Sequence, residues 1–373
     1  MQDREPLWRK APTRAQWAGR PVDPSRSSEL PWWKEPTRAQ WAAFLAAWSG
    51  WVLDAFDFVI FGLVAQELIK EFDVGLTAIG GSIALTLLVR LMGGFVAGWM
   101  ADRWGRKLPL MLSLIWFAAF NAAIAFAPTF TWVLVLRTLF GFGMGAQWTA
   151  GTALAMENWP VRSRKIASGL LQAGWPIGFF LAATVYGAVV PAWGWRALFV
   201  IAAAPALLVI PIRFMVPSEV SKGTAPDRAQ QVSFADLMVP EVRRMLILGT
   251  LVMALGFIVY YALTAHYMAM LRIEHLLSAA EAALDVKIFL VSMLTSVIGA
   301  GWFANRFGVV KALTIPALLM VPALPLYVGV VPVALPLGAF LGGMLGVGYS
   351  GVTPILTTSL FPGHGRARAI GLI

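Results

Sequence analysis

The sequence predicts an all-α polytopic membrane protein built from two pseudo-symmetric halves. Of its 373 residues, 59% are hydrophobic and only 13% are charged, and the mean hydropathy is +0.73. So little polar surface cannot cover so much apolar material in water. Ten apolar segments are long enough to cross a hydrocarbon core of about 30 Å, which takes about 20 helical residues. A charged turn between two of these segments recurs later in the chain, which indicates that one half duplicates the other.

The ten apolar segments are expected to be helices, because lipid offers the backbone no hydrogen-bond partner. Their approximate spans are 41–66, 77–100, 108–127, 131–155, 166–190, 195–216, 245–270, 284–304, 310–331 and 333–358. In the fifth span, Pro176 predicts a kink. A polar stretch separates the sixth span from the seventh. The predicted organisation is a cytoplasmic tail (1–40), a first six-helix half (41–216), a cytoplasmic linker (217–244) and a second half (245–373).

The basic residues indicate which way the chain crosses the membrane. With the N-terminus inside, 23 of the 29 Lys and Arg residues fall on the cytoplasmic side and three fall outside. This bias predicts a cytoplasmic N-terminus. The net charge of +10 is therefore a topology signal, and we expect no nucleic-acid partner. The tail has no apolar run and is not a signal peptide. We expect a multi-pass protein of the bacterial inner membrane, with the lipid bilayer as its surroundings.

The repeated turn reads Gly98-Trp-Met-Ala-Asp-Arg-Trp-Gly-Arg-Lys107, and its second copy reads Gly301-Trp-Phe-Ala-Asn-Arg-Phe-Gly308. The two copies lie 203 positions apart. A similar offset pairs Pro160 with Pro362, so Ile373 corresponds to a position only a few residues into the fifth helix. We therefore expect the second half to lack its last two helices. An even ten-helix transporter is the alternative.

The repeated turn resembles the signature loop between helices 2 and 3 of the major facilitator superfamily of transporters. Two further segments, Gly50-Trp-Val-Leu-Asp-Ala-Phe-Asp-Phe58 and Arg137-Thr-Leu-Phe-Gly-Phe-Gly-Met-Gly145, are similar to helices 1 and 4 of its sialate:proton and aromatic acid:proton symporters. The resemblance covers about residues 32–373 and implies two six-helix halves that rock about a midplane site. It assigns the turn to gating, by clasping helices of the opposite half. The gating residues would be Gly98, Asp102, Arg103, Gly105, Arg106, Lys107, Asn305 and Arg306.

Two carboxylates in the first helix form the expected proton-coupling site. Asp54 and Asp57 are three residues apart, so both lie on roughly one face of the helix. Carboxylates at this depth are costly unless they face a water-filled path or a partner. The helical rise places Arg137 of the fourth helix at about the same depth. Together the three could take up a proton on one side and release it on the other; a static salt bridge is the alternative.

Arg90 is the expected anchor for substrate. It lies mid-span in the second helix, near the level of Gln147. The resemblance implies an acid at position 147, so this chain departs from the pattern there. An organic anion could give Arg90 the carboxylate partner that a neutral amide cannot. Alternatively, Arg90 binds carbonyls and Gln147 and only holds helices together.

The duplication offers a comparison between the halves. It places Phe257, Tyr260 and Met293 where the first half has Asp54, Asp57 and Arg90. We therefore expect proton handling in the first half and a largely aromatic wall from helices 7 and 10. The candidate substrate contacts, each with packing as the alternative, are Arg90, Gln147, Trp148, Gln172, Tyr260, Tyr261 and Tyr349.

The predicted function is proton-coupled import of an organic acid, sialate-like or another carboxylate, by alternating access. A proton-coupled sugar or other small-metabolite permease, an exporter and a transport-inactive fragment are the alternatives. An enzyme is not expected, and we name no catalytic residue, metal ligand or cofactor. Cysteine is absent, and His266, His275 and His364 are not spaced as metal ligands. The expected partners are protons and a small-molecule substrate, and the expected state is a monomer.

Overall fold

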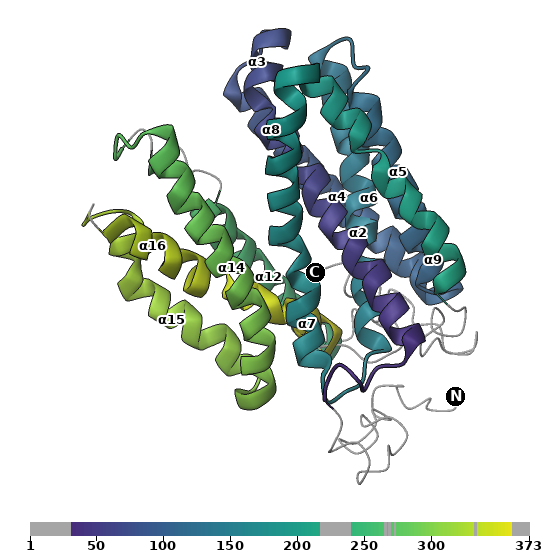
Figure 1. The fold of residues 1–373 in the computed structure, drawn as a ribbon. Helices are drawn as coiled ribbons and strands as arrows, with labels where there is room; N and C mark the ends of the chain where they lie inside the picture. The colour runs from purple at the N-terminus through teal and green to yellow at the C-terminus, as the bar shows by residue number, and fades with distance from the viewer. Residues whose placement is uncertain are drawn as a thin grey trace.

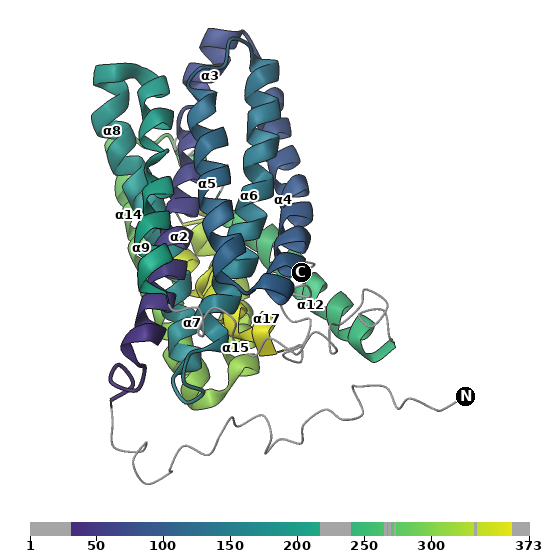
Figure 2. The ribbon, with the colours of Figure 1, turned by 90° about the vertical axis from the view of Figure 1, so that its right-hand side faces the viewer.

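A computed structural model describes residues 31–216, 240–264, 267, 270–271, 274–331 and 334–359. The predicted tail up to residue 30, most of the linker and the expected start of an eleventh helix lie outside the described residues. Among the described residues no strand occurs, and helices make up nearly everything (Figures 1 and 2). The predicted all-α polytopic fold is confirmed. In the described part of the chain, eight helical stretches are long and apolar enough to cross a membrane.

The helices form two bundles (Figure 1). The first bundle consists of α2 (Arg38–Leu63), α3 (Ala65–Phe72), α4 (Leu76–Trp104), α5 (Lys107–Ile124), α6 (Phe130–Glu157), α7 (Arg164–Gln172), α8 (Gly174–Ile201), the 3-10 helix η1 (Ala204–Leu208) and α9 (Val209–Met215). The second bundle consists of α12 (Pro240–Thr264), α14 (Ala279–Phe307), α15 (Val309–Tyr327), α16 (Leu335–Leu341), the π-helix η4 (Gly342–Gly346), the 3-10 helix η5 (Gly348–Val352) and α17 (Thr353–Ser359).

The eight apolar stretches and the ten predicted spans differ in two places. The fifth and sixth predicted spans count as one stretch of 52 residues, Arg164–Met215. That stretch is interrupted at Gly194, whose φ of 76° and ψ of 171° are not helical. It is also interrupted at Ala173, between α7 and α8. Pro176 has no backbone N–H, so it cannot donate the helical hydrogen bond to the carbonyl of Gln172. The fourth predicted span, α6, is absent from the eight. It is a buried helix packed against α2, α4 and α5.

The duplication is visible in backbone geometry. Helices α4 and α14 are both 29 residues long and begin 203 positions apart. The first ends at Gly105 with a φ of 89°, and the second ends at Gly308 with a φ of 95°. In both, the glycine N–H donates to the carbonyl four residues earlier, at 3.0 and 2.9 Å. This left-handed conformation strains any residue with a Cβ atom, which explains the repeated glycine.

The tenth predicted span is not one continuous helix. Between α16 and α17 the chain passes through η4 and η5. The closely spaced glycines here allow tight contacts, because a Cβ on Gly343 would lie 2.3 Å from the Phe289 carbonyl oxygen. The hydroxyl of Ser296 donates to the carbonyl of Met344 across this contact. Single-turn π segments inside helices occur frequently at functional sites.

The bundles meet at one end, which we call the α7 end; the opposite end, which carries α3, is the α3 end. Contacts between bundles are made mainly by α7, which packs on α14, η5 and α17. From there the bundles diverge toward the α3 end (Figure 1). At the crossing of α7 and α14, a Cβ on Gly169 would lie 2.8 Å from the Val297 carbonyl oxygen. Likewise, a Cβ on Gly301 would lie 2.6 Å from that of Lys165. Glycine on both sides therefore permits this close backbone approach.

Candidate functional site

A cavity lies between the two bundles, with about 590 Å³ of space free of protein atoms, including its opening to solvent. Aromatic side chains form most of its wall, and among the described residues Arg90 is the one charged residue that lines it. The first bundle contributes Trp51, Arg90, Trp148, Gln172 and Trp175. The second bundle contributes Met253, Phe257, Tyr260, Tyr261, Met293, Tyr349, Ser350 and Thr353. This lining is typical of a small-molecule site, which is mostly apolar with a few polar groups that fix orientation.

Arg90 reaches the cavity from α4, and no carboxylate of the described residues lies within ion-pair distance of it, although Asp54 interacts with it electrostatically at longer range. One of its terminal nitrogens lies 3.7 Å from the Met144 sulfur, and its guanidinium carbon lies 5.8 Å from the centre of the Trp51 ring. No ion pair to Arg90 occurs within the part of the chain that the structure describes. Its duplicate, Met293, lines the same cavity. The cavity thus holds a guanidinium whose remaining donors can bind an anion.

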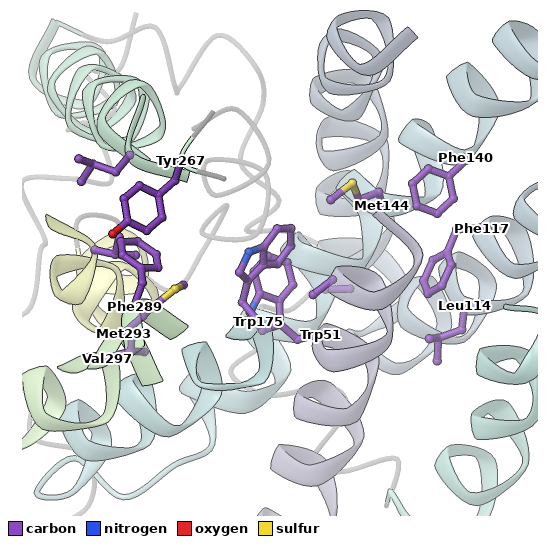
Figure 3. Close-up of a cluster of buried hydrophobic side chains, with 14 of the residues drawn as sticks. Trp51, Leu114, Phe117, Phe140, Met144, Trp175, Tyr267, Phe289, Met293 and Val297 are labelled. Atoms are coloured by element: carbon purple, nitrogen blue, oxygen red, sulfur yellow. The ribbon is translucent and has the colours of Figure 1, made fainter. Parts of the chain in front are cut away.

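Three tryptophans of the first bundle stack beside Arg90. The Trp51 ring lies 4.7 Å from that of Trp148 and 5.0 Å from that of Trp175, centre to centre. In Figure 3, Trp51 and Trp175 lie between the buried side chains of the two bundles. The Trp175 indole N–H donates a 2.7 Å hydrogen bond to the Tyr260 hydroxyl, which links α8 to α12 across the cavity. These rings offer flat faces against which an aromatic substrate can pack.

The discontinuous segment of the second bundle completes the wall. Tyr349 and Ser350 belong to η5, and Thr353 begins α17. The Tyr349 hydroxyl donates to the carbonyl of Gly256 on α12. The Tyr349 ring would clash with a Cβ at Gly256, at 2.8 Å, so this glycine makes room for the ring. These contacts hold Tyr349, in the 3-10 helix η5, against α12.

Asp54 and Asp57 lie beside Arg137; neither lines the cavity, but Asp54 is close enough to interact electrostatically with Arg90 and Tyr261, which do. The side chains of Asp54, Asp57 and Arg137 are fully buried. Arg137 donates a 3.4 Å hydrogen bond to the backbone carbonyl of Asp57, and its guanidinium carbon lies 4.3 Å from the Phe61 ring centre and 4.4 Å from that of Phe140. Within the described part of the chain, the carboxylate oxygens of both aspartates lack a hydrogen-bond partner, as do two of the Arg137 nitrogens. Burying ionisable groups without hydrogen-bond partners is costly, and ionisable residues inside a membrane protein are therefore usually functional.

The two glutamine candidates occupy different places. Gln147 is buried and lines a second, smaller cavity next to the first; its side-chain oxygen accepts a 3.2 Å hydrogen bond from the Ser113 hydroxyl. It fills the space beside Gly50, where a Cβ would lie 2.1 Å from its nitrogen. Gln172 lines the main cavity, and its side-chain oxygen is buried without a hydrogen-bond partner. Gln172 thus offers an acceptor to the cavity, whereas Gln147 packs helices.

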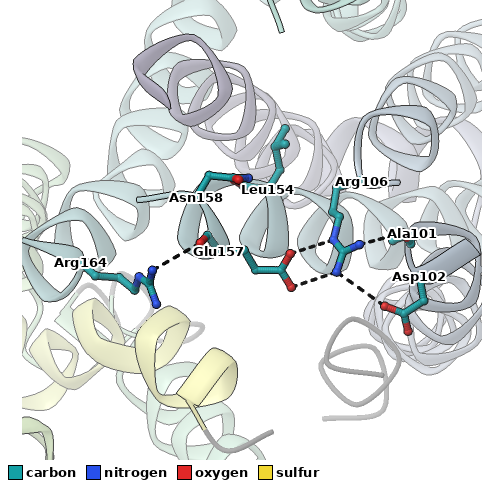
Figure 4. Close-up of polar contacts among 7 residues, drawn as sticks. All are labelled: Ala101, Asp102, Arg106, Leu154, Glu157, Asn158 and Arg164. Atoms are coloured by element: carbon teal, nitrogen blue, oxygen red, sulfur yellow. Dashed lines mark hydrogen bonds and ion pairs between the residues drawn. The ribbon is translucent and has the colours of Figure 1, made fainter. Parts of the chain in front are cut away.

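The predicted gating loop makes its described contacts within the first bundle (Figure 4). Arg106 forms a two-pronged ion pair with Glu157 at the end of α6, at 2.8 and 3.1 Å, and it also donates to the Ala101 carbonyl. Asp102 lies 3.8 Å from the same guanidinium. Lys107 donates to the carbonyls at the end of α9. Residues 360–373, which follow α17 in the opposite half, lie outside the described residues, so the expected clasp between the halves stays a prediction.

The other loop residues lie beside aromatic rings or on the helices that flank the turns. The Arg103 guanidinium lies 5.8 Å from the Trp99 ring centre and 5.6 Å from that of Trp104. Arg306 lies 5.8 Å from the ring centre of Phe307. Asn305 is exposed, and Gly98 is buried within α4. The second copy therefore reproduces the turn of the first without an ion pair to the rest of the described second bundle.

Three residues with important contacts in the structure are not singled out from the sequence. The sequence marks Trp175 only as a neighbour of a helix kink, although it closes the tryptophan stack. Glu157 is not among the residues that the sequence analysis names, although it binds Arg106. Ser168 carries no sequence signal at all, although its hydroxyl joins the two bundles. The position of Glu157 three residues before Pro160, which the duplication pairs with Pro362, is the signal that could have identified it.

The family of the chain follows from sequence comparison. Residues 42–373 match the Major Facilitator Superfamily, and the chain belongs to this family. It is thus a multi-pass membrane protein of the class that the resemblance implied.

Three curated relatives, all named as transporters, illustrate the likeness. A probable 4-methylmuconolactone transporter of Cupriavidus pinatubonensis is 33% identical over 213 residues, which cover 56% of this chain and 50% of the relative. The 4-hydroxybenzoate transporter PcaK of Pseudomonas putida is 26% identical, with coverage of 85% and 78%. The sialic acid transporter NanX of Escherichia coli is 31% identical, with coverage of 47% and 43%. The matches thus span about half the length of the first and third of these relatives.

Solved structures show the same fold. The proton:xylose symporter XylE superposes with a TM-score of 0.70 at 16% identity, covering 89% of this chain and 84% of that one. The human organic anion transporter MFSD10 superposes with a TM-score of 0.65 at 16% identity, covering 91% of each chain. At this identity the likeness concerns the fold alone.

Proposed function

We propose that this protein is a secondary active transporter that imports an organic acid together with protons, by alternating access. The observation that carries the proposal is Arg90, a cation without an ion pair among the described residues, in a mostly aromatic cavity between two bundles. Binding sites between repeats near mid-membrane are typical of secondary transporters. The cargo would therefore be anionic and of metabolite size.

The aromatic wall narrows the class of cargo. We propose that Arg90 binds a carboxylate while the rings of Trp51, Trp148 and Trp175 pack against the body of the substrate. Offset and edge-to-face packing of this kind contributes about 0.5–1.5 kcal/mol beyond burial. Aromatic monocarboxylates fit this arrangement best, which agrees with the name of the PcaK relative. A sialate-like acid is the second choice and agrees with the name of the NanX relative.

Proton handling is assigned to Asp54, Asp57 and Arg137. The three buried groups lie next to one another on α2 and α6. Asp54 is three residues from Trp51, which lines the cavity, so one helix joins the proton site to the substrate site. Rocking of the bundles would change solvent access to the carboxylates, and uptake or release of a proton would follow.

We further propose that the α7 end faces the cytoplasm of a bacterial inner membrane. The basic-residue bias supports this orientation, because loops 104–107 and 158–163 carry basic residues at that end. The closed α7 end would then make this structure an outward-facing state. Substrate would enter from the α3 end and leave when the bundles separate at the α7 end. A monomer contains every residue used in this scheme.

Direct binding to the purified protein tests the role of Arg90. 4-Hydroxybenzoate and sialic acid are the probes, and calorimetry gives their affinity for the wild type, Arg90→Gln and Arg90→Lys. We expect Arg90→Gln to weaken binding of the preferred acid about tenfold or more, since a hydrogen bond to a charged group contributes about 1.5–3 kcal/mol. Arg90→Lys keeps the charge but loses the two-pronged geometry, so its loss should be intermediate.

The matched control is Arg243→Gln, which removes one positive charge at an exposed position on α12. It should bind the acid like the wild type. Equal affinity of Arg90→Gln and wild type for every acid tested would refute the assignment, as would tight binding of a neutral sugar that ignores Arg90.

A further inference from the structure

Residues 31–37, directly before α2, cross the α7 end; we call this segment the strap. Its shape is fixed locally. The Lys34 N–H donates a 2.8 Å hydrogen bond to the Pro31 carbonyl, which closes a turn. Thr37 then caps α2, exchanging hydrogen bonds with Gln40 in a capping box. The strap is therefore held in one conformation before it meets any other helix.

The strap is anchored on the first bundle through Glu35. The Ser163 hydroxyl donates a 2.6 Å hydrogen bond to the Glu35 carboxylate, and Arg162 forms a 3.3 Å ion pair with it. The Glu35 side chain is only 8% exposed, so the Ser163 contact is shielded from water. Gln40 adds a 2.6 Å hydrogen bond to the carbonyl of Asn158 in the same loop. These contacts tie the strap to the loop between α6 and α7.

One strap residue reaches the second bundle. The Trp32 ring meets that of Trp302 on α14 edge to face, with ring centres 5.5 Å apart and an interplanar angle of 89°. Trp302 follows Gly301, whose backbone packs against α7. The ring pair thus bridges the bundles directly beside their closest backbone contact. If the bundles separate here, Trp32 stays with the first bundle and Trp302 leaves with the second.

We propose that the strap is a latch, in which Trp32 binds Trp302 and holds the two bundles together at the α7 end. This inference rests on the proposed rocking of the bundles. Among the described residues, every hydrogen bond and ion pair of the strap is made within the strap or to the first bundle. The Trp32–Trp302 ring pair is therefore the contact through which the latch acts on the second bundle. Edge-to-face pairs of this strength shift a two-state equilibrium about twofold to tenfold. Losing Trp32 should therefore raise the population open at the α7 end by that factor.

Distances between spin labels test the latch independently of transport. The chain has no cysteine, so Leu108→Cys and Val310→Cys provide the only labelling sites. Both positions are exposed, and they lie at the α7 ends of α5 and α15 in different bundles. Pulsed electron spin resonance of the full chain in lipid nanodiscs then reports how far the α7 end opens. Trp32→Ala and Trp302→Ala are made singly and together in this background.

We expect each single variant to shift the distance distribution toward longer values, about twofold to tenfold in population ratio. The double variant should shift it no further, because both changes remove the same contact. Trp132→Ala is the matched control, because Trp132 is an exposed tryptophan at the start of α6, at the opposite, α3 end of the molecule. It should leave the distribution unchanged.

An unchanged distribution in Trp32→Ala would overturn the latch, and so would additive effects of Trp32→Ala and Trp302→Ala. Neither outcome concerns the cargo, because the distances are measured without substrate. Conversely, failure of Arg90 to bind an acid would overturn the proposed function while leaving the latch distances to be judged separately.

Discussion

The hydroxyl of Ser168 donates a 2.8 Å hydrogen bond to the carbonyl of Gly351, 183 positions away in the chain. The same oxygen accepts a 3.1 Å hydrogen bond from the backbone N–H of Ile355. Ser168 is fully buried on α7, and both partners belong to the second bundle. One small side chain thus satisfies two backbone groups across the contact that closes the α7 end.

Ser168→Ala should open the α7 end. The variant leaves the Gly351 carbonyl and the Ile355 N–H unpaired only while the bundles are closed, since opening exposes both to water. A buried unpaired group costs about 1–3 kcal/mol, which corresponds to about a 5- to 150-fold shift toward the open state. The distance between spin labels at Leu108→Cys and Val310→Cys measures this shift. The control is Thr184→Ala, which removes an exposed hydroxyl whose hydrogen bond to the Phe180 carbonyl lies within α8. It should leave the spin-label distances unchanged. Equal distances in the two variants would contradict the role of Ser168 in closing the α7 end.

Gly301→Ala should also shift the protein toward the state that is open at the α7 end, and by more than Ser168→Ala does. Its Cβ would lie 2.6 Å from the Lys165 carbonyl oxygen, so α7 and α14 must move apart. Gly299→Ala is the control on the same helix, because a Cβ there meets nothing within 4 Å. The control should even gain up to about 1 kcal/mol of helix stability, as alanine favours helix over glycine. Spin-label distances and thermal unfolding separate these results, and a closed α7 end in Gly301→Ala would count against the crossing as the closure point.

The buried ion pair of Arg106 and Glu157 should contribute more to the free energy of unfolding than an exposed charge such as Arg103 does. Their side chains are 0% and 1% exposed, so removing one partner leaves a buried charge. We expect Glu157→Gln to lower the free energy of unfolding by about 3–5 kcal/mol. Arg103→Gln alters an exposed cation in the same loop and should cost less than about 1 kcal/mol. Thermal unfolding in detergent compares the stability of the two variants. Similar losses of stability in both would show that the buried pair contributes no more than the exposed cation.

Stability at the α3 end should depend on pH through Glu71. The pKa of Glu71 is lowered from its ordinary value of 4.5 because Arg196 donates hydrogen bonds to it, with a further one from Trp195. A lowered pKa means that the contact stabilises the fold above the ordinary value and is lost as pH falls through the lowered one.

Glu71→Gln should therefore lower the free energy of unfolding by less than about 1 kcal/mol at pH 7, because the Arg196–Glu71 pair is well exposed. The difference from wild type should vanish at pH values well below 4.5. Thermal unfolding at both pH values gives the comparison. Glu274→Gln, at an exposed position of the same end, should show no such trend. A difference that grows on acidification would contradict the contact.

Hydrophobic segment length and turn residues predict the helices well, because lipid forces long apolar segments into helices. The predicted span 77–100 became α4 (Leu76–Trp104), and 108–127 became α5 (Lys107–Ile124). The repeat at a fixed offset also anticipated that Gly105 and Gly308 share a backbone conformation. These features depend only on residues near one another in the chain.

Pairing between helices was harder to predict. Equal depth placed Arg137 near Asp57, but depth does not say which atoms meet, and the guanidinium bonds the backbone carbonyl. Gln147 is at the level of Arg90, yet its rotation about the helix axis takes it out of the main cavity. The span 333–358 was predicted as one helix, whereas the structure places a π-helix and a 3-10 helix around Gly346. Helix rotation and unwinding depend on the opposing surface, which one sequence does not specify.

Proton movement driven by substrate tests the central claim most directly. An aromatic acid such as 4-hydroxybenzoate is added to de-energised vesicles that carry the protein, and external pH is followed together with uptake of the labelled acid. The account predicts that the medium becomes more alkaline as the acid enters, and that Asp54→Asn with Asp57→Asn abolishes this rise. Entry of the acid with no change in external pH, or an undiminished rise in the double variant, would contradict proton coupling at these aspartates.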